Sequence, residues 1–427
     1  MADKTITDVP GLLDQVRDRF AHVEACPLTG ERIFFENAGG ALTLKSVVAT
    51  SSFWAGVPDN QGRANEASKE LMAVIDQGKA DMRTLMGAEG AGGHVFVGES
   101  GTEVLFRLIR TAVVGCEAGG SVIGTTLEHP ASRSALAHWA NVTGRERRLA
   151  VHDDATGTVG PDAFAAVVTP DTRVMTIVHT SPVTGMGVDV GACVAAVRAV
   201  APDCLVIVDG IQHACHGHID IGAMGADGYA ISPYKLFSRH GYGVGFASDR
   251  MTAFERERLM GGPETAWEFG TRDTGAYATF TDVAEHFDWL GSHFTDATGR
   301  RARMEAAANA IHAHEKSLTD AMLHGTGNLR GLADMEGVHV VGGVDNPARE
   351  GLVSFWMDGR DAPDIVAALE ADGIRTHTRK ADHYSGNVLE PLGLSGCVRV
   401  SLAHYNSVDE VARFLSSMAK LTERAAA

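Results

Sequence analysis

The feature that most constrains the fold is a series of short apolar runs between about residues 90 and 250, separated by segments of helical periodicity. The runs include HVFVG near 94, SVIGTT near 121, VMTIVHT near 174 and CLVIVD near 204. Because they are almost continuously apolar, they predict strands buried on both faces, and hence an α/β fold with a mostly parallel sheet and crossover helices. Ligands of such sheets bind at the carboxyl ends of the strands. The segments that follow HTSPVTG and VIVDGIQHACHG are therefore the first candidates for a functional site.

The remainder of the chain predicts a second, smaller unit. After about residue 274 the pattern becomes helical, and VHVVGG, LVSFWM, IRTHT and CVRVSL then read as strands alternating with helices. We predict a large domain over 30–275 and a smaller domain formed by 1–29 and 276–427, with an N-terminal helix, long connecting helices and a C-terminal α/β part.

Charge and cysteine usage narrow the class of partner. With 37 Lys+Arg against 54 Asp+Glu, the net charge of -17 disfavours nucleic acid, which requires a concentrated basic face, but permits a local pocket for one small anion. The six cysteines form no CxxC pair and predict reduced thiols in a cytoplasmic protein. The N-terminus has no signal-peptide pattern, and the apolar runs are too short to span a membrane.

The segment most informative about chemistry is VIVDGIQHACHGHIDIGAMGADGYAISPYKLFSRHGYGVG, at 206–245. A buried strand ends in Asp209, and Lys235 lies between a short strand and a Gly-rich turn. Burying these charges is unfavourable unless something pairs with them. A pyridine aldehyde cofactor would pair with both, since a carboxylate keeps the ring nitrogen protonated and an amine forms a Schiff base with the aldehyde.

This segment resembles the class V aminotransferase family of pyridoxal-phosphate (PLP) enzymes, which includes cysteine desulfurases and isopenicillin N epimerase-like proteins. The resemblance extends from FFENAGG at 34–40 to VRVSLAHYNSVDEV at 398–411. It implies a PLP-dependent transferase of fold type I, with a mostly parallel mixed sheet flanked by helices in the large domain and a smaller C-terminal α/β domain. It also implies a cytoplasmic homodimer with the active site at the subunit interface, acting on a small amino acid.

The resemblance assigns expected roles around the cofactor. Lys235 is the Schiff-base lysine, Asp209 the partner of the pyridine nitrogen, and Gln212 the donor to the phenolic oxygen. His129, in LEHPASRSA, is expected to stack on the ring and relay protons. The expected phosphate ligands are Gly101 and Thr102 in GESGTEVLFRLI, with Ser232 before the lysine and Thr271 of GTRD reaching across a dimer interface. A Gly-Thr pair at a helix start is by itself more often only a cap.

Substrate binding is expected to rest on an arginine. The planar guanidinium of Arg binds both oxygens of a carboxylate. Arg399 in VRVSLAHYN resembles the family arginine that binds the substrate α-carboxylate. Asn37 and Arg63 lie in segments that resemble active-site loops of the same group, with shorter matches.

A metal site is the competing interpretation of one cluster. His213, Cys215, His216 and His218 are close in sequence, but their spacing matches no common zinc motif, so we predict no metal.

The sequence leaves the reaction open between two branches of the family. A desulfurase that forms a persulfide requires a cysteine in the loop before the carboxylate arginine, and THTRKADHYSGNVLEPLGLSG at 376–396 contains none. Pro182 occupies the place where many desulfurases carry Asn. We therefore expect lyase chemistry that expels a sulfur- or selenium-containing β-group without a persulfide, with transamination or epimerisation as alternatives. The alternative from another class of function is an inactive binding or regulatory protein on this fold. For the loop at 376–396 two interpretations stay open: it recognises the substrate side chain, or it is solvated surface.

Overall fold

The apolar runs form one seven-stranded sheet in the computed structural model, which describes residues 4–58 and 60–426. Its strands follow the order β4 (His94–Gly98), β10 (Gly243–Ala247), β9 (Gly228–Ile231), β8 (Leu205–Asp209), β7 (Thr172–Val178), β5 (Ser121–Thr125) and β6 (Glu146–Ala150). β10 is antiparallel to both of its neighbours, and the other pairs are parallel. Every residue of β5, β8, β9 and β10 is buried, which explains why these strands lack polar alternation. The predicted fold class is confirmed.

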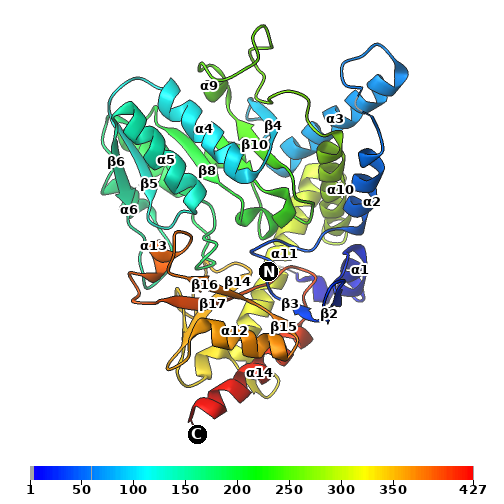
Figure 1. The fold of residues 1–427 in the computed structure, drawn as a ribbon, viewed down its shortest axis with the longest axis vertical. Coiled ribbons are helices and arrows are strands. Elements are labelled where there is room, and N and C mark those ends of the chain that lie inside the picture. The colour runs from blue at the N-terminus through cyan, green and yellow to red at the C-terminus, as the bar shows by residue number, and fades with distance from the viewer. Residues whose placement is uncertain (1–3, 59, 427) are drawn as a thin grey trace.

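Helices cover both faces of this sheet (Figure 1). Along β8, Leu205 and Ile207 pack in a cluster with α4 (Gly101–Gly115) and α5 (Pro130–Thr143), because alternate strand residues face opposite sides. Val206 and Val208 pack in the cluster on the other face. The longer helices contributing to that cluster are α1 (Leu12–Arg19), α2 (Lys45–Ala55), α3 (Glu66–Leu85), α7 (Val190–Val200), α10 (Thr274–Gly291) and the first half of α11 (Arg300–His324).

A separate four-stranded antiparallel sheet forms the second unit, below the large sheet in Figure 1. Its order is β13 (Val338–Val340), β14 (Leu352–Met357), β17 (Gly396–Ser401) and β16 (His377–Lys380). With α12 (Ala362–Ala371), α14 (Val408–Ala426) and the end of α11, it encloses its own apolar cluster. The helices α1 and α10 pack with the large sheet, although the sequence assigns residues 1–29 and 276–427 to the smaller domain. The predicted domain boundaries stay a prediction.

The remaining elements are short. They are β1 (Ala25–Cys26), β2 (Gly30–Glu31), β3 (Ile33–Phe34), α6 (Pro161–Ala165), α8 (Ile221–Met224), α9 (Asp249–Thr252), β11 (Gly325–Thr326), β12 (Leu329–Arg330), β15 (Ile374–Arg375), α13 (Gly386–Leu389) and the 3-10 turns η1 (Ile6–Asp8), η2 (His213–Cys215), η3 (Pro233–Lys235) and η4 (Leu332–Asp334). Within the described ranges, no helix is both long and apolar enough to span a bilayer.

Candidate active site

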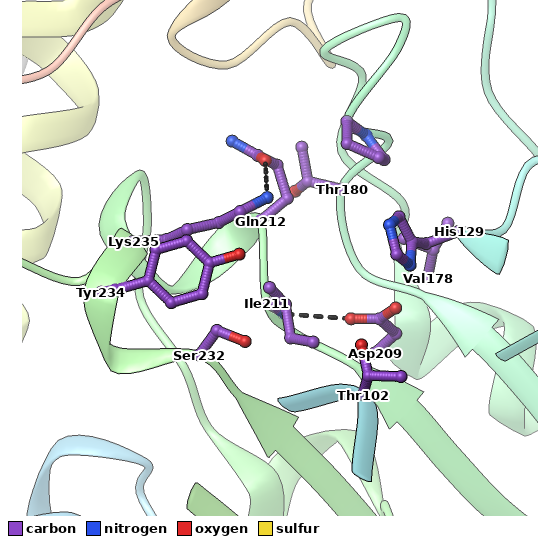
Figure 2. A pocket seen from close by; sticks show the side chains of 11 residues that line it. Thr102, His129, Val178, Thr180, Asp209, Ile211, Gln212, Ser232, Tyr234 and Lys235 are labelled. Atoms are coloured by element: carbon purple, nitrogen blue, oxygen red, sulfur yellow. Dashed lines mark hydrogen bonds between the residues drawn. The ribbon is translucent and has the colours of Figure 1, made fainter. Parts of the chain in front are cut away.

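A pocket lies at the carboxyl ends of β7, β8 and β9, where the α/β architecture favours ligand binding (Figure 2). It encloses about 380 Å³ of empty space, part of it open to solvent. The lining residues are Thr102, His129, Val178, Thr180, Pro182, Asp209, Ile211, Gln212, Ser232, Tyr234 and Lys235. The structure therefore brings together residues that are 133 positions apart in the sequence, from Thr102 to Lys235 (235 minus 102).

Asp209 is the last residue of β8 and is 3% exposed. One carboxylate oxygen accepts a hydrogen bond from the backbone N–H of Ile211 at 3.1 Å, and the other accepts one from the Ser132 hydroxyl at 3.3 Å. In the described part of the chain no basic side chain forms an ion pair with it, and burial raises its pKa. A buried carboxylate without a cationic partner fits a site for a protonated ring nitrogen.

Lys235 ends η3, the turn that follows β9, and its amine donates a hydrogen bond to Gln212 Oε1 at 3.1 Å. Burial, followed by the nearby Arg399 charge, lowers its pKa to about 8. At pH 7 about one amine in ten is then unprotonated, against about one in three thousand for a free lysine. The nucleophilic form required for a Schiff base is therefore available near neutral pH.

The start of α4 forms one end of the pocket. A Cβ atom on Gly101 would lie 2.2 Å from Ser232 Oγ and 2.6 Å from Ile211 Cδ1, so any larger residue here would displace these two pocket side chains. The N–H groups of the first turn of a helix have no intrahelical acceptor, and Thr102 and Ser232 add hydroxyl groups beside them. This combination suits a phosphate group.

His129 caps the N-terminus of α5 and lies across the cavity from Lys235 (Figure 2). Its Nδ1 accepts a hydrogen bond from the backbone N–H of Ala131 at 3.2 Å, which places the proton of the neutral ring on Nε2. Burial, followed by the Lys235 charge, lowers its pKa to about 3. The ring is therefore neutral at physiological pH, as a group stacked on an aromatic cofactor requires.

Arg399 lies on β17 and approaches the pocket from the small sheet. Its Nη1 donates a hydrogen bond to the carbonyl of Pro182, a pocket residue, at 2.9 Å. Its Nε is buried without a hydrogen-bond partner. Burial, followed by Arg379, lowers its pKa to about 9. An arginine with incomplete hydrogen bonding at this rim fits a carboxylate-binding position.

Gly101 and Arg399 border this pocket, and three other predicted site residues do not line it. The amide of Asn37 is used within the protein, since it donates to the Ser401 carbonyl at 2.8 Å and accepts from Tyr405. Thr271 lines a different pocket, together with Trp54. Arg63 is exposed on the loop before α3.

A buried polar chain behind Lys235 was missed by the sequence analysis. Gln212 Nε2 lies 3.0 Å from His216 Nε2, and His216 Nδ1 lies 2.6 Å from Glu315 Oε2 on α11. In the same region His213 Nδ1 lies 2.7 Å from Glu350 Oε1. The run His213–His218 was the available signal, and it was weighed only as a metal site and set aside.

The carboxylates that pair with these histidines are distant in sequence. In the described ranges no group of three or more His, Cys, Asp and Glu side chains could hold a metal ion. Val178, Thr180 and Ile211 are further lining residues that the sequence did not single out.

The buried Asp209, the buried amine of Lys235 and the close approach at Gly101 together fit a PLP site. A family model described as Aminotransferase class-V matches residues 33–414, so this chain belongs to the class V aminotransferase family. Members of this family use pyridoxal 5'-phosphate, and the chain is a PLP-dependent enzyme.

Several relatives and solved structures are similar over most of the chain. A probable cysteine desulfurase of Xylella fastidiosa (strain 9a5c) is 28% identical over 413 residues, covering 94% of this chain and 92% of its own. One from Pseudomonas putida is 32% identical over 312 residues, covering 71% of each chain. The structure superposes on cysteine desulfurase CsdA of Escherichia coli with a TM-score of 0.77 at 21% identity, covering 96% and 98% of the two chains. For the apo cysteine desulfurase of Thermococcus onnurineus NA1 the TM-score is 0.80 at 20% identity, with the same coverage. These similarities confirm the predicted fold type I.

Proposed function

We propose that this protein is a PLP-dependent lyase that acts on a small amino acid, expels a sulfur- or selenium-containing β-group, and forms no persulfide on the protein. The observation that carries the persulfide-free part is the composition of the pocket. No cysteine is among its described lining residues, and the 376–396 segment contains none. Cys397, the nearest cysteine in sequence to Arg399, is buried on β17, and burial raises its pKa to about 11. A buried thiol of that pKa is a poor nucleophile.

The proposed chemistry distributes roles among this chain's residues. PLP, when bound, withdraws electrons from the Cα of an attached amino acid and so weakens the bonds to that carbon. The Asp209 carboxylate would hold the proton on the ring nitrogen, and Arg399 would bind the substrate α-carboxylate. The Lys235 amine, freed when the substrate binds, would take the Cα proton, and the neutral His129 would cover the ring face.

The proposal is tested by product analysis. We expect the holoenzyme to release the sulfur or selenium group with pyruvate or alanine, and to leave no persulfide detectable by mass spectrometry. Lys235→Ala should abolish both turnover and the visible absorption band of the bound cofactor, whereas Cys397→Ser should retain turnover within about twofold because the thiol is buried and is not among the described residues that line the pocket.

Each alternative has its own outcome. Transfer of the amino group to a second keto acid would replace the lyase by an aminotransferase, and inversion at Cα without release would replace it by an epimerase. A protein that stays colourless after PLP addition would indicate a binding or regulatory protein. Loss of turnover in Cys397→Ser would contradict the persulfide-free route.

We also infer that the protein is a cytoplasmic homodimer, with Thr271 serving the partner's active site. Thr271 lies in a pocket separate from that of Lys235, and the six cysteines are all free thiols. Sedimentation should give the mass of a dimer, and cell fractionation should place the protein in the cytosol. Mixing inactive Lys235→Ala and Thr271→Ala subunits should restore activity, because one site of the hybrid then has both residues. Failure to restore it would argue that each subunit is self-contained.

A further inference from the structure

The small sheet places a second arginine beside Arg399. β16 and β17 are antiparallel, with His377 opposite Arg399 and Arg379 opposite Cys397. Because alternate residues of a strand share a face, Arg379 and Arg399 lie on the same face as diagonal neighbours. This face meets the large unit, since Arg399 Nη1 donates to the Pro182 carbonyl and Ser354 Oγ, opposite Arg399 on β14, donates to that of Val183 at 2.6 Å.

In the described part of the chain the guanidinium of Arg379 forms no hydrogen bond or ion pair, and its one close partner is an aromatic ring. Its Nε and Nη2 are buried without hydrogen bonds, and no carboxylate oxygen is close enough for an ion pair. Arg375, on the preceding strand β15, is by contrast paired with Glu36 at 2.6 Å and is exposed. Arg379 is half-buried, and two of its buried N–H groups lack acceptors, which is unfavourable unless an anion pairs with them.

The segment after Arg379 lies beside His129, a residue that lines the pocket. The Tyr384 ring lies 6.0 Å from the His129 ring, and Arg379 Cζ lies 5.9 Å from the centroid of the same tyrosine. Hydrogen bonds attach this segment to the large unit. Arg133 Nη2 donates to the His383 carbonyl at 2.6 Å, and Asn387 Nδ2 donates to the carbonyls of Thr126 at 2.7 Å and Glu128 at 3.4 Å. These contacts place Arg379 beside the candidate active site, and none of them pairs its positive charge with an anion.

The positive charge of Arg379 also affects the pKa of two residues that line the pocket. It contributes, after burial and Arg399, to lowering the pKa of Lys235, and after burial and Lys235 to lowering that of His129. A substrate with one carboxylate would satisfy Arg399 and leave Arg379 unpaired. A second anionic group on the substrate would satisfy both arginines.

We propose that Arg379 binds the side-chain anion of the substrate, so that the enzyme acts on an α-amino acid with an acidic side chain while Arg399 binds its α-carboxylate. This proposal rests on the proposed function, because it places the amino acid in the Lys235 pocket. It decides between the two interpretations of the 376–396 loop in favour of substrate recognition. Neutral amino acids of similar size should bind more weakly, because they leave Arg379 without a partner.

The test is spectral titration of the holoenzyme with aspartate and cysteine sulfinate as acidic probes, and alanine and cysteine as neutral probes. We expect the wild type to bind at least one acidic probe more than tenfold more tightly than alanine. Arg379→Met should raise the Kd for that probe by about 10- to 100-fold and change the Kd for alanine by less than threefold. Lys380→Gln, on the next and exposed residue of β16, is the matched control and should change neither Kd.

Folding and function can be separated from this specificity. Arg379→Lys keeps the charge but not the planar fork, so it should show a smaller loss for the acidic probe than Arg379→Met. If Arg379→Met does not fold, the comparison of wild type with Arg379→Lys and the wild-type preference itself remain decisive. A wild type with no preference for acidic probes, or an Arg379→Met variant that weakens alanine and the acidic probe equally, overturns the proposal. A holoenzyme whose spectrum responds to no amino acid overturns instead the proposed function.

Discussion

The buried pair of Glu315 and His216 yields the sharpest stability prediction. Both side chains are 1% exposed, and Glu315 Oε2 lies 2.6 Å from His216 Nδ1. Removing one partner of a buried ion pair costs about 3–5 kcal/mol. At about 2.1 cal/mol/K of unfolding entropy per residue over 427 residues, this cost corresponds to a decrease in Tm of about 3–6 °C for Glu315→Leu.

The neighbouring residue provides the matched control. Lys316 pairs with Asp320 at 2.9 Å, but both side chains are 49% exposed, and such surface pairs contribute about 0.3–0.5 kcal/mol. Lys316→Leu should therefore lower Tm by less than about 1 °C. The assay is scanning calorimetry of the holoenzyme, with the double variant His216→Leu/Glu315→Leu closing a thermodynamic cycle. The reasoning is refuted if Glu315→Leu and Lys316→Leu have the same Tm, or if the double variant loses as much as the sum of the two single variants.

Two further predictions concern the cofactor. Gly101→Ala should raise the Kd for PLP more than about tenfold, because the added Cβ would overlap Ser232 Oγ. The control Gly160→Ala, whose Cβ meets open space at the start of α6, should leave the Kd unchanged. Equal affinities of the two variants in an absorbance titration would contradict the close approach at Gly101. The rate at which the apoprotein binds PLP covalently should rise about tenfold per pH unit and level off near pH 8. The reason is that the pKa of Lys235 is lowered to about 8 and only its neutral amine reacts. A rate that still rises steeply at pH 10 in stopped-flow absorbance would indicate a lysine of ordinary pKa.

The parts of the site that strand order alone predicts are those that follow strands of the large sheet. Asp209 ends β8 and Lys235 closely follows β9, so their order in the chain translates directly into adjacency at one edge of the sheet. His129 follows β5 in the same way. For such residues, recognising the buried strand is enough to place the side chain at the ligand-binding edge, because the carboxyl ends of parallel strands all lie at the same edge of the sheet.

Strand order does not predict contacts between residues that come together only when the two units pack against each other. Asn37 follows no strand of the large sheet, and its side-chain oxygen accepts a hydrogen bond from Tyr405, 368 positions later. Glu315 meets His216 only because α11 crosses behind the pocket, at a rotation that its own sequence does not fix. The unpaired state of Arg379 is likewise a property of what surrounds it after folding, since its sequence neighbourhood contains Asp382 and other polar residues.

The acidity of the chain and the anion-binding character of its pocket are compatible because the two act over different distances. The net charge of -17 is spread over a surface where charges separated by more than about 8 Å are largely screened at physiological ionic strength. Among the described residues that line the pocket, Asp209 is the only acidic one. Glu128, beside His129, is fully buried, and burial raises its pKa to about 8, so it is mostly protonated at pH 7 and adds little negative charge. With Lys235 inside the pocket and Arg399 at its rim, the local balance is cationic, and Arg379 adds to it from the same sheet face as Arg399. The field that a bound amino acid meets is therefore set by these few buried groups rather than by the sum over the chain.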